Sequence, residues 1–418
     1  MQFKKVFAVA AVAGVALAAD KNNSTLTTAT PSVTKDCSFS DFTATQSAQV
    51  AQVAACPTAV GDITIYGDAF GNIDLTGLEQ VYGDLSIKNA TKAAGVNAPT
   101  LQLVSGSLEL NANTILSNLN LAQLTTVGTL NFNALPALET TGLTAGITSA
   151  DSVIISDTGL SSLTGINVFE LKTFNVNNND QIETINSGLK RVTDTLDISY
   201  NAEKVDVTLD QLTGANNIIL QSINSISAQN LTVANGSVAV SSSSVDKVQF
   251  KKLQTIGKSL TINKNDDLEE LDFPKLTSIG GALEISDNDK LDSFDGFPQL
   301  KTIGGSVNMN GTFNNGTFES LQRVAGGFTL KTDGELSCQA FNKLNSNGDV
   351  KGDKFQCEDR VTTTSSSSKK NGSTETDSSD DSTGAAETTT SKKNDAPSPA
   401  GKLASVVAAF AAIGVALI

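Results

Sequence analysis

LTSIGGALEISDNDKL, residues 276–291, contains the unit that decides the fold of this chain. Within it, Leu283 and Ile285 alternate with polar residues, which indicates a short strand with one buried face. Three further large apolar residues flank this strand. The preceding unit, from Leu253 to Leu268, has the same arrangement. The chain therefore contains a repeat.

The apolar-x-apolar pair of this strand recurs thirteen times, at intervals of 20 to 24 residues. The pairs are Ile63/Ile65, Leu85/Ile87, Leu108/Leu110, Leu130/Phe132, Val153/Ile155, Phe174/Val176, Leu196/Ile198, Ile218/Leu220, Val238/Val240, Leu260/Ile262, Leu283/Ile285, Val307/Met309 and Phe328/Leu330. Periods of this length mark solenoids, in which stacked coils bury the apolar side chains that one coil cannot bury alone. The sequence predicts a mainly β, right-handed parallel β-solenoid of about 13 coils.

Two residue types recur at the expected bends. Asn residues follow several strands, and their amides are expected to bond free backbone groups there, which is a structural role rather than a catalytic one. They are Asn89, Asn178, Asn201, Asn265 and Asn288. The pairs Gly280-Gly281, Gly304-Gly305 and Gly326-Gly327 precede strands, where positive φ or close packing would exclude a side chain. No helix is expected after them, so they do not form phosphate loops.

The four cysteines flank the repeat, with Cys37 and Cys56 before it and Cys338 and Cys357 after it. Three pairings are possible, and the length of the rod favours Cys37 with Cys56 and Cys338 with Cys357. Zinc is disfavoured by the spacing. Because open sheet edges template aggregation, we expect disulfide-bonded end caps. The predicted N-terminal cap spans residues 37–60, with a small helix within 41–55; the solenoid spans 61–336 and the C-terminal cap spans 337–360.

The two termini resemble targeting segments. Residues 1–19 have the charged, apolar and small-residue order of a secretory signal peptide. A Thr-rich segment follows at 20–36, and a Ser/Thr-rich stalk with too few apolar residues to fold is predicted at 361–394. Residues 395–418 read as a glycosylphosphatidylinositol (GPI) attachment propeptide, with Asn394 as the predicted attachment site and Gly384 as the alternative.

Composition narrows the possible chemistry. The chain has no His, which excludes Ser-His-Asp and Cys-His nucleophiles and imidazole metal sites. With 29 Lys and Arg against 44 Asp and Glu, the net charge is −15, which argues against a nucleic-acid partner. No Trp and three Tyr make a strong lectin with aromatic platforms a poor interpretation. We predict no cofactor.

Eight N-glycosylation sequons agree with a surface location. They are Asn22, Asn23, Asn89, Asn230, Asn235, Asn310, Asn315 and Asn371. Those within the solenoid are expected on one or two exposed faces, because a glycan cannot enter the stack.

The densest carboxylate cluster lies in two consecutive coils. It consists of Asp266, Asp267, Glu269, Glu270, Asp272, Asp287, Asp289, Asp292 and Asp295. Stacking could align these groups as the acid and base of a glycosidase, or as a calcium site. The favoured interpretation is a solvated face that keeps the rod soluble.

The ordered set of signal peptide, cysteine cap, coils such as residues 279–285, second cap, stalk and GPI tail resembles a known family. It is similar to the fungal cell-wall family of the extracellular-mutant-33 and sporulation-specific-protein-2 group, whose ectodomain is similar to leucine-rich-repeat-like receptor L domains. The resemblance covers the whole chain. It implies a glycoprotein at the plasma membrane, partly linked to wall glucan, that is needed for wall integrity, and no catalytic residues carry over. Lys392-Lys393 is similar to a dibasic pattern of membrane retention.

The favoured function is a non-enzymatic, GPI-anchored protein that organises the fungal cell wall, with wall glucan and other wall proteins as possible partners. An alternative is a binding module that recognises a wall polysaccharide or protein on the parallel sheet face. A third hypothesis is a carboxylate-dependent glycan hydrolase or transglycosylase. An exposed apolar patch on the sheet would favour the second hypothesis, and two carboxyls about 5 to 10 Å apart in a groove would favour the third.

Overall fold

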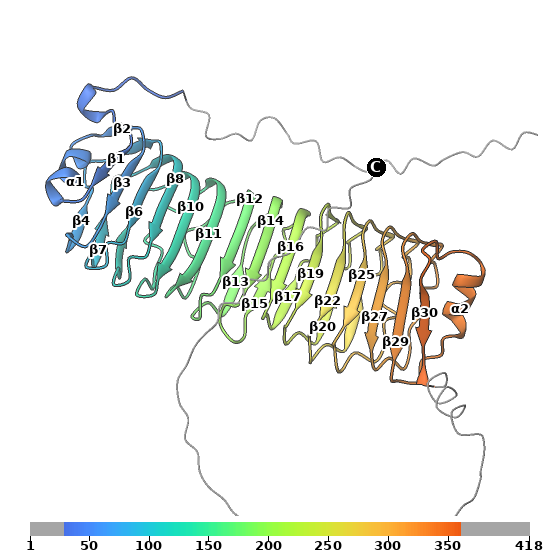
Figure 1. Cartoon of the computed structure of the whole chain (residues 1–418). Coiled ribbons are helices and arrows are strands. Elements are labelled where there is room, and N and C mark those ends of the chain that lie inside the picture. The colour runs from blue at the N-terminus through green and yellow to red at the C-terminus, as the bar shows by residue number, and fades with distance from the viewer. Residues whose placement is uncertain (1–28, 361–418) are drawn as a thin grey trace, which may run out of the picture. The chain divides into compact units, whose positions relative to one another are not determined.

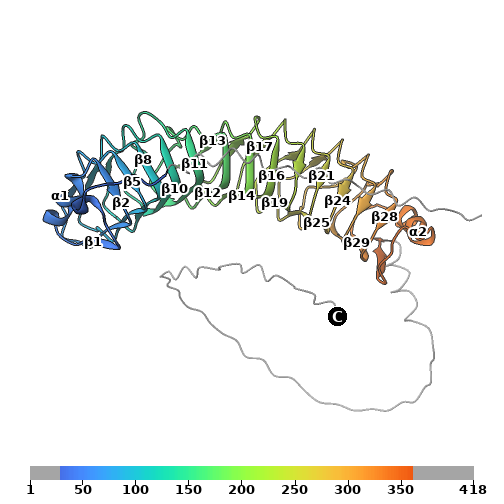
Figure 2. The same ribbon diagram turned by 90° about the horizontal axis from the view of Figure 1, so that it is seen from above.

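The structure is a computed structural model that describes residues 29–360. These residues form a parallel β-solenoid of about 13 turns with a disulfide near each end, so the predicted fold class is confirmed. Figures 1 and 2 show the stacked coils as a curved rod. The predicted signal peptide, stalk, GPI segment and Asn394 lie outside the described residues, as do the sequons Asn22, Asn23 and Asn371.

One row of strands runs the length of the rod, and we call it the first row. Its strands are β1 (Phe42–Ala44), β3 (Ile63–Tyr66), β6 (Leu85–Lys88), β8 (Leu103–Asn111), β10 (Thr126–Leu135), β11 (Ser149–Thr158), β12 (Glu170–Asn177), β14 (Arg191–Ser199), β16 (Gly214–Gln221), β19 (Val238–Ser241), β22 (Leu260–Asn263), β25 (Leu283–Ser286), β27 (Val307–Gly311), β29 (Phe328–Thr332) and β30 (Phe355–Glu358). Each strand pairs in parallel with the next. In Figure 2, strands such as β10, β14 and β25 lie along the inner side of the arc.

The thirteen predicted apolar pairs all lie on first-row strands and are buried. They stack in register: Leu260 aligns with Leu283, and Ile262 aligns with Ile285. Two further strands, β1 and β30, extend the row at its ends. The apolar pairs predicted from the sequence do not include these strands, because Ala44 and Cys357 occupy the second apolar position.

A second row of short strands lies just before the first row in each coil. It consists of β2 (Thr58–Val60), β5 (Gln80–Tyr82), β18 (Val233–Ala234), β21 (Thr255–Ile256), β24 (Ser278–Ile279), β26 (Thr302–Ile303) and β28 (Arg323–Val324). In the middle of the rod the two rows merge into long strands such as β10, whose register with β8 shifts between Val127 and Thr129. The two rows therefore form one sheet of 22 strands.

A third row of short strands lies in eight of the coils and forms three smaller sheets. Its strands are β4 (Asn72–Asp74), β7 (Gly95–Asn97), β9 (Asn118–Asn120), β13 (Thr184–Asn186), β15 (Asp206–Thr208), β17 (Ser225–Ser227), β20 (Lys247–Gln249) and β23 (Glu270–Asp272). One buried apolar side chain at the centre of each strand, such as Ile73 or Val96, points into the same core. The core thus runs along the whole stack.

The glycine pairs lie where consecutive coils approach most closely. A Cβ on Gly304 would lie 2.1 Å from the backbone oxygen of Gly280, and a Cβ on Gly280 would lie 2.1 Å from that of Gly257. The three pairs do not have left-handed φ angles. Of the two predicted reasons for glycine, the structure supports close packing.

Replacing Gly304 with alanine is expected to lower the free energy of unfolding by about 1–3 kcal/mol, because the new methyl group overlaps backbone of the neighbouring coil. Urea unfolding followed by circular dichroism measures the loss. Gly71→Ala is the matched control, because a Cβ at Gly71 meets nothing within 4 Å and its φ is not left-handed. Equal unfolding midpoints for the two variants would contradict the close-packing interpretation.

Ten of the first-row strands, from β6 to β25, reach a sharp corner with two specialised positions. The first position has a left-handed φ of 49–56° and is held by Asn89, Ala112, Ala134, Asp157, Asn178, Tyr200, Ser222, Ser242, Lys264 and Asp287. The next residue points inward, and five asparagines occupy this position: Asn113, Asn179, Asn201, Asn265 and Asn288. We call these five residues the asparagine ladder.

The asparagine ladder links consecutive coils through buried hydrogen bonds. Asn288 Oδ1 accepts from the backbone N–H of Asn265 at 3.1 Å and from Asn265 Nδ2 at 3.0 Å. Asn288 Nδ2 donates to the carbonyl oxygen of Ile262 at 2.9 Å. The predicted structural role is therefore confirmed for Asn201, Asn265 and Asn288.

The prediction that the side-chain amide bonds backbone groups at the bend is wrong for Asn89 and Asn178. Both are exposed and occupy the left-handed position, so the inward positions of their coils belong to Ala90 and Asn179. Asparagine is enriched at left-handed φ as well as at bends that need a side-chain amide. The sequence pattern could not distinguish two adjacent positions that favour the same residue.

The N-terminal end of the rod is covered by helical segments. They are η1 (Lys35–Cys37) and α1 (Ser47–Ala54), which lies within the segment where a small helix was predicted. Gln46 and Gln49 form a capping box at the start of α1. Cys37 is bonded to Cys56 with a Cα–Cα distance of 5.6 Å, which ties η1 to the end of α1.

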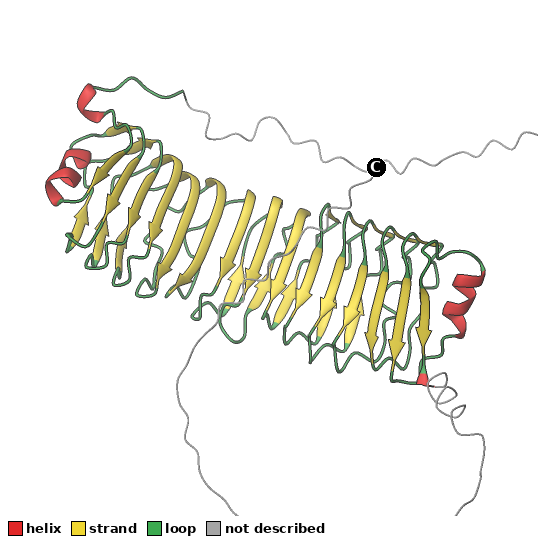
Figure 3. Ribbon diagram, in the orientation of Figure 1, coloured by secondary structure: helices red, strands yellow, loops and turns green. Residues whose placement is uncertain are grey.

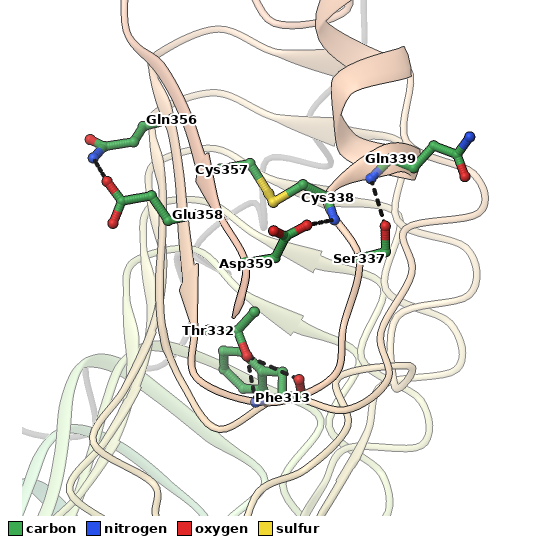
Figure 4. Close-up of a disulfide and its surroundings, with 9 residues drawn as sticks. All are labelled: Phe313, Thr332, Ser337, Cys338, Gln339, Gln356, Cys357, Glu358 and Asp359. Atoms are coloured by element: carbon green, nitrogen blue, oxygen red, sulfur yellow. Dashed lines mark hydrogen bonds between the residues drawn. A yellow bond between two sulfur atoms is a disulfide. The ribbon is translucent and has the colours of Figure 1, made fainter. Parts of the chain in front are cut away.

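The C-terminal end is covered by α2 (Gln339–Ser346), and Figure 3 shows helices gathered at the two ends. Cys338 is bonded to Cys357 of β30, with a Cα–Cα distance of 5.8 Å. The carboxylate of Asp359 accepts the Cys338 N–H at 2.9 Å, which satisfies a donor at the start of α2 (Figure 4). The exact cap and solenoid boundaries stay predictions.

Within residues 29–360, none of the helices is long and apolar enough to cross a membrane.

Candidate functional site

The outer face of the first row is the sheet face on which a binding site was expected. The central residue of each strand points outward and forms a continuous row through the stack. In order it reads Thr43, Thr64, Ser86, Glu109, Asn131, Ile154, Asn175, Asp197, Ile219, Ala239, Thr261, Glu284, Asn308, Thr329 and Gln356. Most of these side chains are small and polar, so this face carries little charge.

The row contains three acidic residues, Glu109, Asp197 and Glu284, and the first two have different surroundings. Glu109 forms a 2.7 Å ion pair with Lys88 on the neighbouring strand. Asp197 has no lysine or arginine partner among the described ion pairs, and Ser199 Oγ donates to its Oδ1 at 2.8 Å. Burial raises the pKa of the Asp197 carboxyl, although the Ser199 hydrogen bond opposes the shift. The charged form of Asp197 is therefore costly in the folded state.

Replacing Asp197 with asparagine is expected to raise the urea midpoint at about pH 7 and to leave it unchanged at about pH 3. Because the folded pKa lies above the unfolded pKa, the stability that the protonated carboxyl contributes is lost as the pH rises through the folded value. Asp194→Asn on the same strand is the control, since Asp194 is exposed. If the urea midpoint rose equally at both pH values, or rose equally in the Asp194→Asn control, the burial of the Asp197 carboxylate would not be the cause.

Large exposed apolar side chains do not form one patch. Within residues 29–360 they are Tyr66, Ile115, Phe169 and Tyr200, and they lie in different coils. The Nζ of Lys190 lies 4.7 Å from the centroid of the Phe169 ring. Isolated exposed apolar residues are normal on protein surfaces. The apolar patch that would favour binding on the first-row face is thus not found among the described residues.

The predicted acidic cluster is spread over two sides of its coils. Asp287 occupies a left-handed corner, whereas Glu270 and Asp272 lie on β23 of the third row. The cluster residues are exposed except for Asp272, which is half-buried. Within the described part of the chain, no three His, Cys, Asp or Glu side chains are placed to hold a metal ion.

Lysines of neighbouring coils pair with this cluster. Lys290 Nζ lies 2.7 Å from Asp267 Oδ1, and Lys247 Nζ lies 2.6 Å from Glu270 Oε1. The hydrogen bonds to these carboxylates raise the pKa of both lysines. These contacts agree with a solvated face, and such exposed pairs contribute little stability.

A groove lined by polar side chains lies on the third row instead. This groove, of about 490 Å³, is lined by strands β4, β7 and β9, and its polar residues include Asn72, Asp74 and Asn118. A second groove, of about 410 Å³, lies between α1 and β4 and shares Asn72 and Asp74 with the first. Figure 1 shows α1 beside β4 at the blue end of the rod. Asp74 is the one carboxylate that lines either groove.

None of the site residues predicted from the sequence lines either groove. The signal was the repeated Asn-x-Asp or Asn-x-Asn of β4 and β9, which the period of the apolar residues obscured. Neither groove contains the pair of carboxyls that a glycosidase of the usual type needs.

The described sequons lie on several sides of the rod. Asn89 is at a corner after β6 and Asn310 is on β27 of the first row, whereas Asn315 pairs with Ser293 on the side of the third row. Asn235 follows β18, and Asn230 precedes it in a turn. All are exposed except Asn230, which is half-buried. The five described sequons fall at different positions of the repeat, and their glycosylation stays a prediction.

A parallel β-solenoid whose ends are closed by disulfides, and whose outer rows are polar, defines a class: an extracellular repeat protein of the secretory pathway. The chain is 37% identical over 324 residues to the cell surface GPI-anchored protein ECM33 of Candida albicans, a match that covers 77% of this chain and 78% of that protein. It is 34% identical over 305 residues to the cell wall mannoprotein PST1 of Saccharomyces cerevisiae, covering 72% and 68%. With the cell wall protein ecm33 of Schizosaccharomyces pombe it shares 32% over 333 residues, covering 78% and 77%.

The chain therefore belongs to the fungal family of cell-surface GPI-anchored and cell-wall proteins that includes ECM33 and PST1, as the sequence resemblance implied. Its place is the cell surface and the cell wall. No protein-family model matches the chain, and no solved structure matches it.

Proposed function

We propose that this protein is a non-enzymatic, GPI-anchored glycoprotein that organises the fungal cell wall, with the solenoid as a rigid spacer between the membrane and the wall. The relatives carry names of cell-surface and cell-wall proteins, which supports this proposal. The predicted attachment site at Asn394 and the Ser/Thr-rich stalk would hold the rod away from the membrane. Wall glucan and other wall proteins are the proposed partners.

The non-enzymatic part of the proposal rests on what the polar side chains of the described coils bond. Buried polar side chains such as the asparagine ladder bond the backbone of neighbouring coils. The two grooves together contain one carboxylate, Asp74, and its Oδ1 already accepts hydrogen bonds from Thr76 and Asn97. Two-carboxylate hydrolysis has no support in such a groove.

Complementation in fungal cells that lack this protein tests the proposal. Such cells are expected to become sensitive to wall-perturbing dyes, and the full chain should restore resistance. Chains with Asp74→Asn, Asp266→Asn or Asp287→Asn should restore it equally well. A chain that lacks residues 403–418 should appear in the medium and fail to restore resistance.

The enzymatic hypothesis makes the opposite forecast. If a carboxylate variant reaches the cell surface at the normal level but fails to complement, and the purified protein generates new reducing ends from wall polysaccharide, the protein is an enzyme and the proposal is wrong.

A further inference from the structure

The groove on strands β4, β7 and β9 is lined by two rows of outward-facing residues. Facing outward along the stack are Asn72, Gly95 and Asn118 in one row and Asp74, Asn97 and Asn120 in the other. Gly95 has no side chain, and a Cβ there would lie 2.8 Å from Asn72 Oδ1. The Asn72 amide of the neighbouring coil therefore lies over Gly95 and lines the groove.

A hydrogen-bond chain fixes the second row of this groove. Asp74 Oδ1 accepts from the Thr76 N–H at 3.0 Å, from Thr76 Oγ1 at 2.6 Å and from Asn97 Nδ2 at 3.2 Å. Asn120 Nδ2 donates to Asn97 Oδ1 at 2.9 Å. The hydrogen bonds from Thr76 lower the pKa of Asp74, so the carboxylate is ionised. The row is held in place before any ligand arrives, which reduces the entropy lost on binding.

Part of this polar surface is not used by the fold. All three hydrogen bonds to Asp74 use Oδ1, and Oδ2 accepts none within residues 29–360. In the same part of the chain, the Asn72 side chain makes no hydrogen bond. These groups offer two acceptors and two donor hydrogens toward one space.

The adjoining groove adds an apolar wall. Val50, Ala51 and Ala54 of α1, together with Phe70, line the space that shares Asn72 and Asp74. The combined cleft is polar on the strand side and apolar on the helix side. Its two parts, about 490 and 410 Å³, are each in the range of small-molecule sites.

This combination matches one ligand class. A pyranose presents a ring of hydroxyls that both donate and accept, and its C–H faces are apolar. The one ionised carboxylate opposes an anionic ligand, and no described lysine or arginine lines either groove to bind a phosphate or a uronic acid.

We propose that this cleft, between α1 and strands β4, β7 and β9, is a binding site for neutral hexose oligosaccharides. Asn72, Asn118 and Asp74 Oδ2 bind the hydroxyls, and the α1 side chains contact a C–H face. Because the cleft has no aromatic platform, one protein molecule binds one oligosaccharide weakly, with a Kd of about 1 mM. Many anchored copies of the protein on one polysaccharide increase the overall affinity through avidity. This inference rests on the proposed function and deepens it, because wall glucan is a polymer of a neutral hexose.

Saturation-transfer NMR with the full-length protein tests the site. The probes are linear hexaoses of glucose, mannose and N-acetylglucosamine, with hexagalacturonate as the anionic comparison. At least one neutral hexaose is expected to bind at up to about 10 mM. Asn72→Ala should weaken binding about tenfold, since one hydrogen bond is lost. Gly95→Leu should abolish it, because the new side chain would displace the Asn72 amide and block the groove.

Asn186→Ala is the matched control, because Asn186 is an exposed third-row asparagine on β13, outside both grooves. Asn72 makes no described hydrogen bond, so its variant should keep the wild-type urea midpoint. The proposal is overturned if no neutral hexaose binds, if Gly95→Leu binds as well as the wild type, or if hexagalacturonate binds more tightly. Any of these results would leave complementation of wall integrity unaffected and would thus be distinct from a failure of the proposed function.

Discussion

Replacing Asn265 with alanine is expected to lower the free energy of unfolding by about 3 kcal/mol or more. Asn265 is fully buried and connects three coils. Its Oδ1 accepts the Ser243 N–H at 3.1 Å, and its Nδ2 donates to the carbonyl oxygen of Val240 at 3.0 Å and to Asn288 Oδ1 at 3.0 Å. Alanine would leave a buried backbone donor and a buried acceptor without partners, and each costs about 1–3 kcal/mol.

Aspartate at position 265 should be no better than alanine. Its carboxylate could accept from Ser243, but it could not donate to Val240 or Asn288 unless it were protonated. The variant Asn265→Asp is therefore expected to regain stability as the pH falls. This result would separate the loss of the amide donor from the loss of side-chain volume.

Urea unfolding of these variants measures the effect, and Asn178→Gly is the matched control. Asn178 is exposed and has a φ of 54°, which glycine adopts without strain. The control should unfold within about 0.5 kcal/mol of the wild type or be slightly more stable. A loss at Asn265 that is no greater than at Asn178 would show that the asparagine ladder does not stabilise the stack.

The second large effect is expected at the C-terminal cap. Phe341 of α2 is buried, and its ring centroid lies 5.7 Å from that of Phe328 and 6.0 Å from that of Phe294. Replacing Phe341 with alanine should cost about 3–5 kcal/mol through lost burial and the cavity that remains. Because α2 lies against β30, its release would also expose the last strand of the sheet.

Each coil of a solenoid contacts only its neighbours, so the Phe341→Ala variant should unfold first in the C-terminal coils. Unfolding of the whole rod should follow only under stronger denaturing conditions. We expect faster hydrogen exchange in β30 and β29 than in β16, and concentration-dependent self-association in sedimentation velocity. Lys343→Ala is the control, because Lys343 is exposed on the same helix. Uniform exchange along the rod, or a monomeric variant with normal exchange in β30, would contradict a capping role for α2.

Much of the fold could be predicted from the sequence because its information is local and periodic. The pair Leu283 and Ile285 recurs at nearly constant spacing, and a side chain that alternates on a strand must point inward in every coil. The cysteines could be placed at the ends for the same reason, since nothing repeats beyond them. The third row of strands was less evident, because each strand contributes one buried residue, such as Val96, at its centre.

Two features depended on distinctions that the sequence does not contain. Asn178 and Asn179 are adjacent asparagines, and only the backbone angle at the corner decides which amide enters the stack. Strand β30 escaped detection because α2 is inserted before it and Cys357 takes the place of an apolar residue.

The sequence by itself determined the repeat, the parallel stack and the apolar core. The reason is that the apolar side chains of all coils can be buried together only if they recur at the same position in every coil. Only the tertiary structure decided which polar side chains bond neighbouring coils and which remain available. Asn113 and Asn118 are close in sequence, yet Asn113 is buried and bonds Ala90 and Ile87, whereas Asn118 lines an open groove. The physical reason is that hydrogen-bond partners in a solenoid come from other coils, about 22 residues away, and the register that joins them exists only after the coils stack.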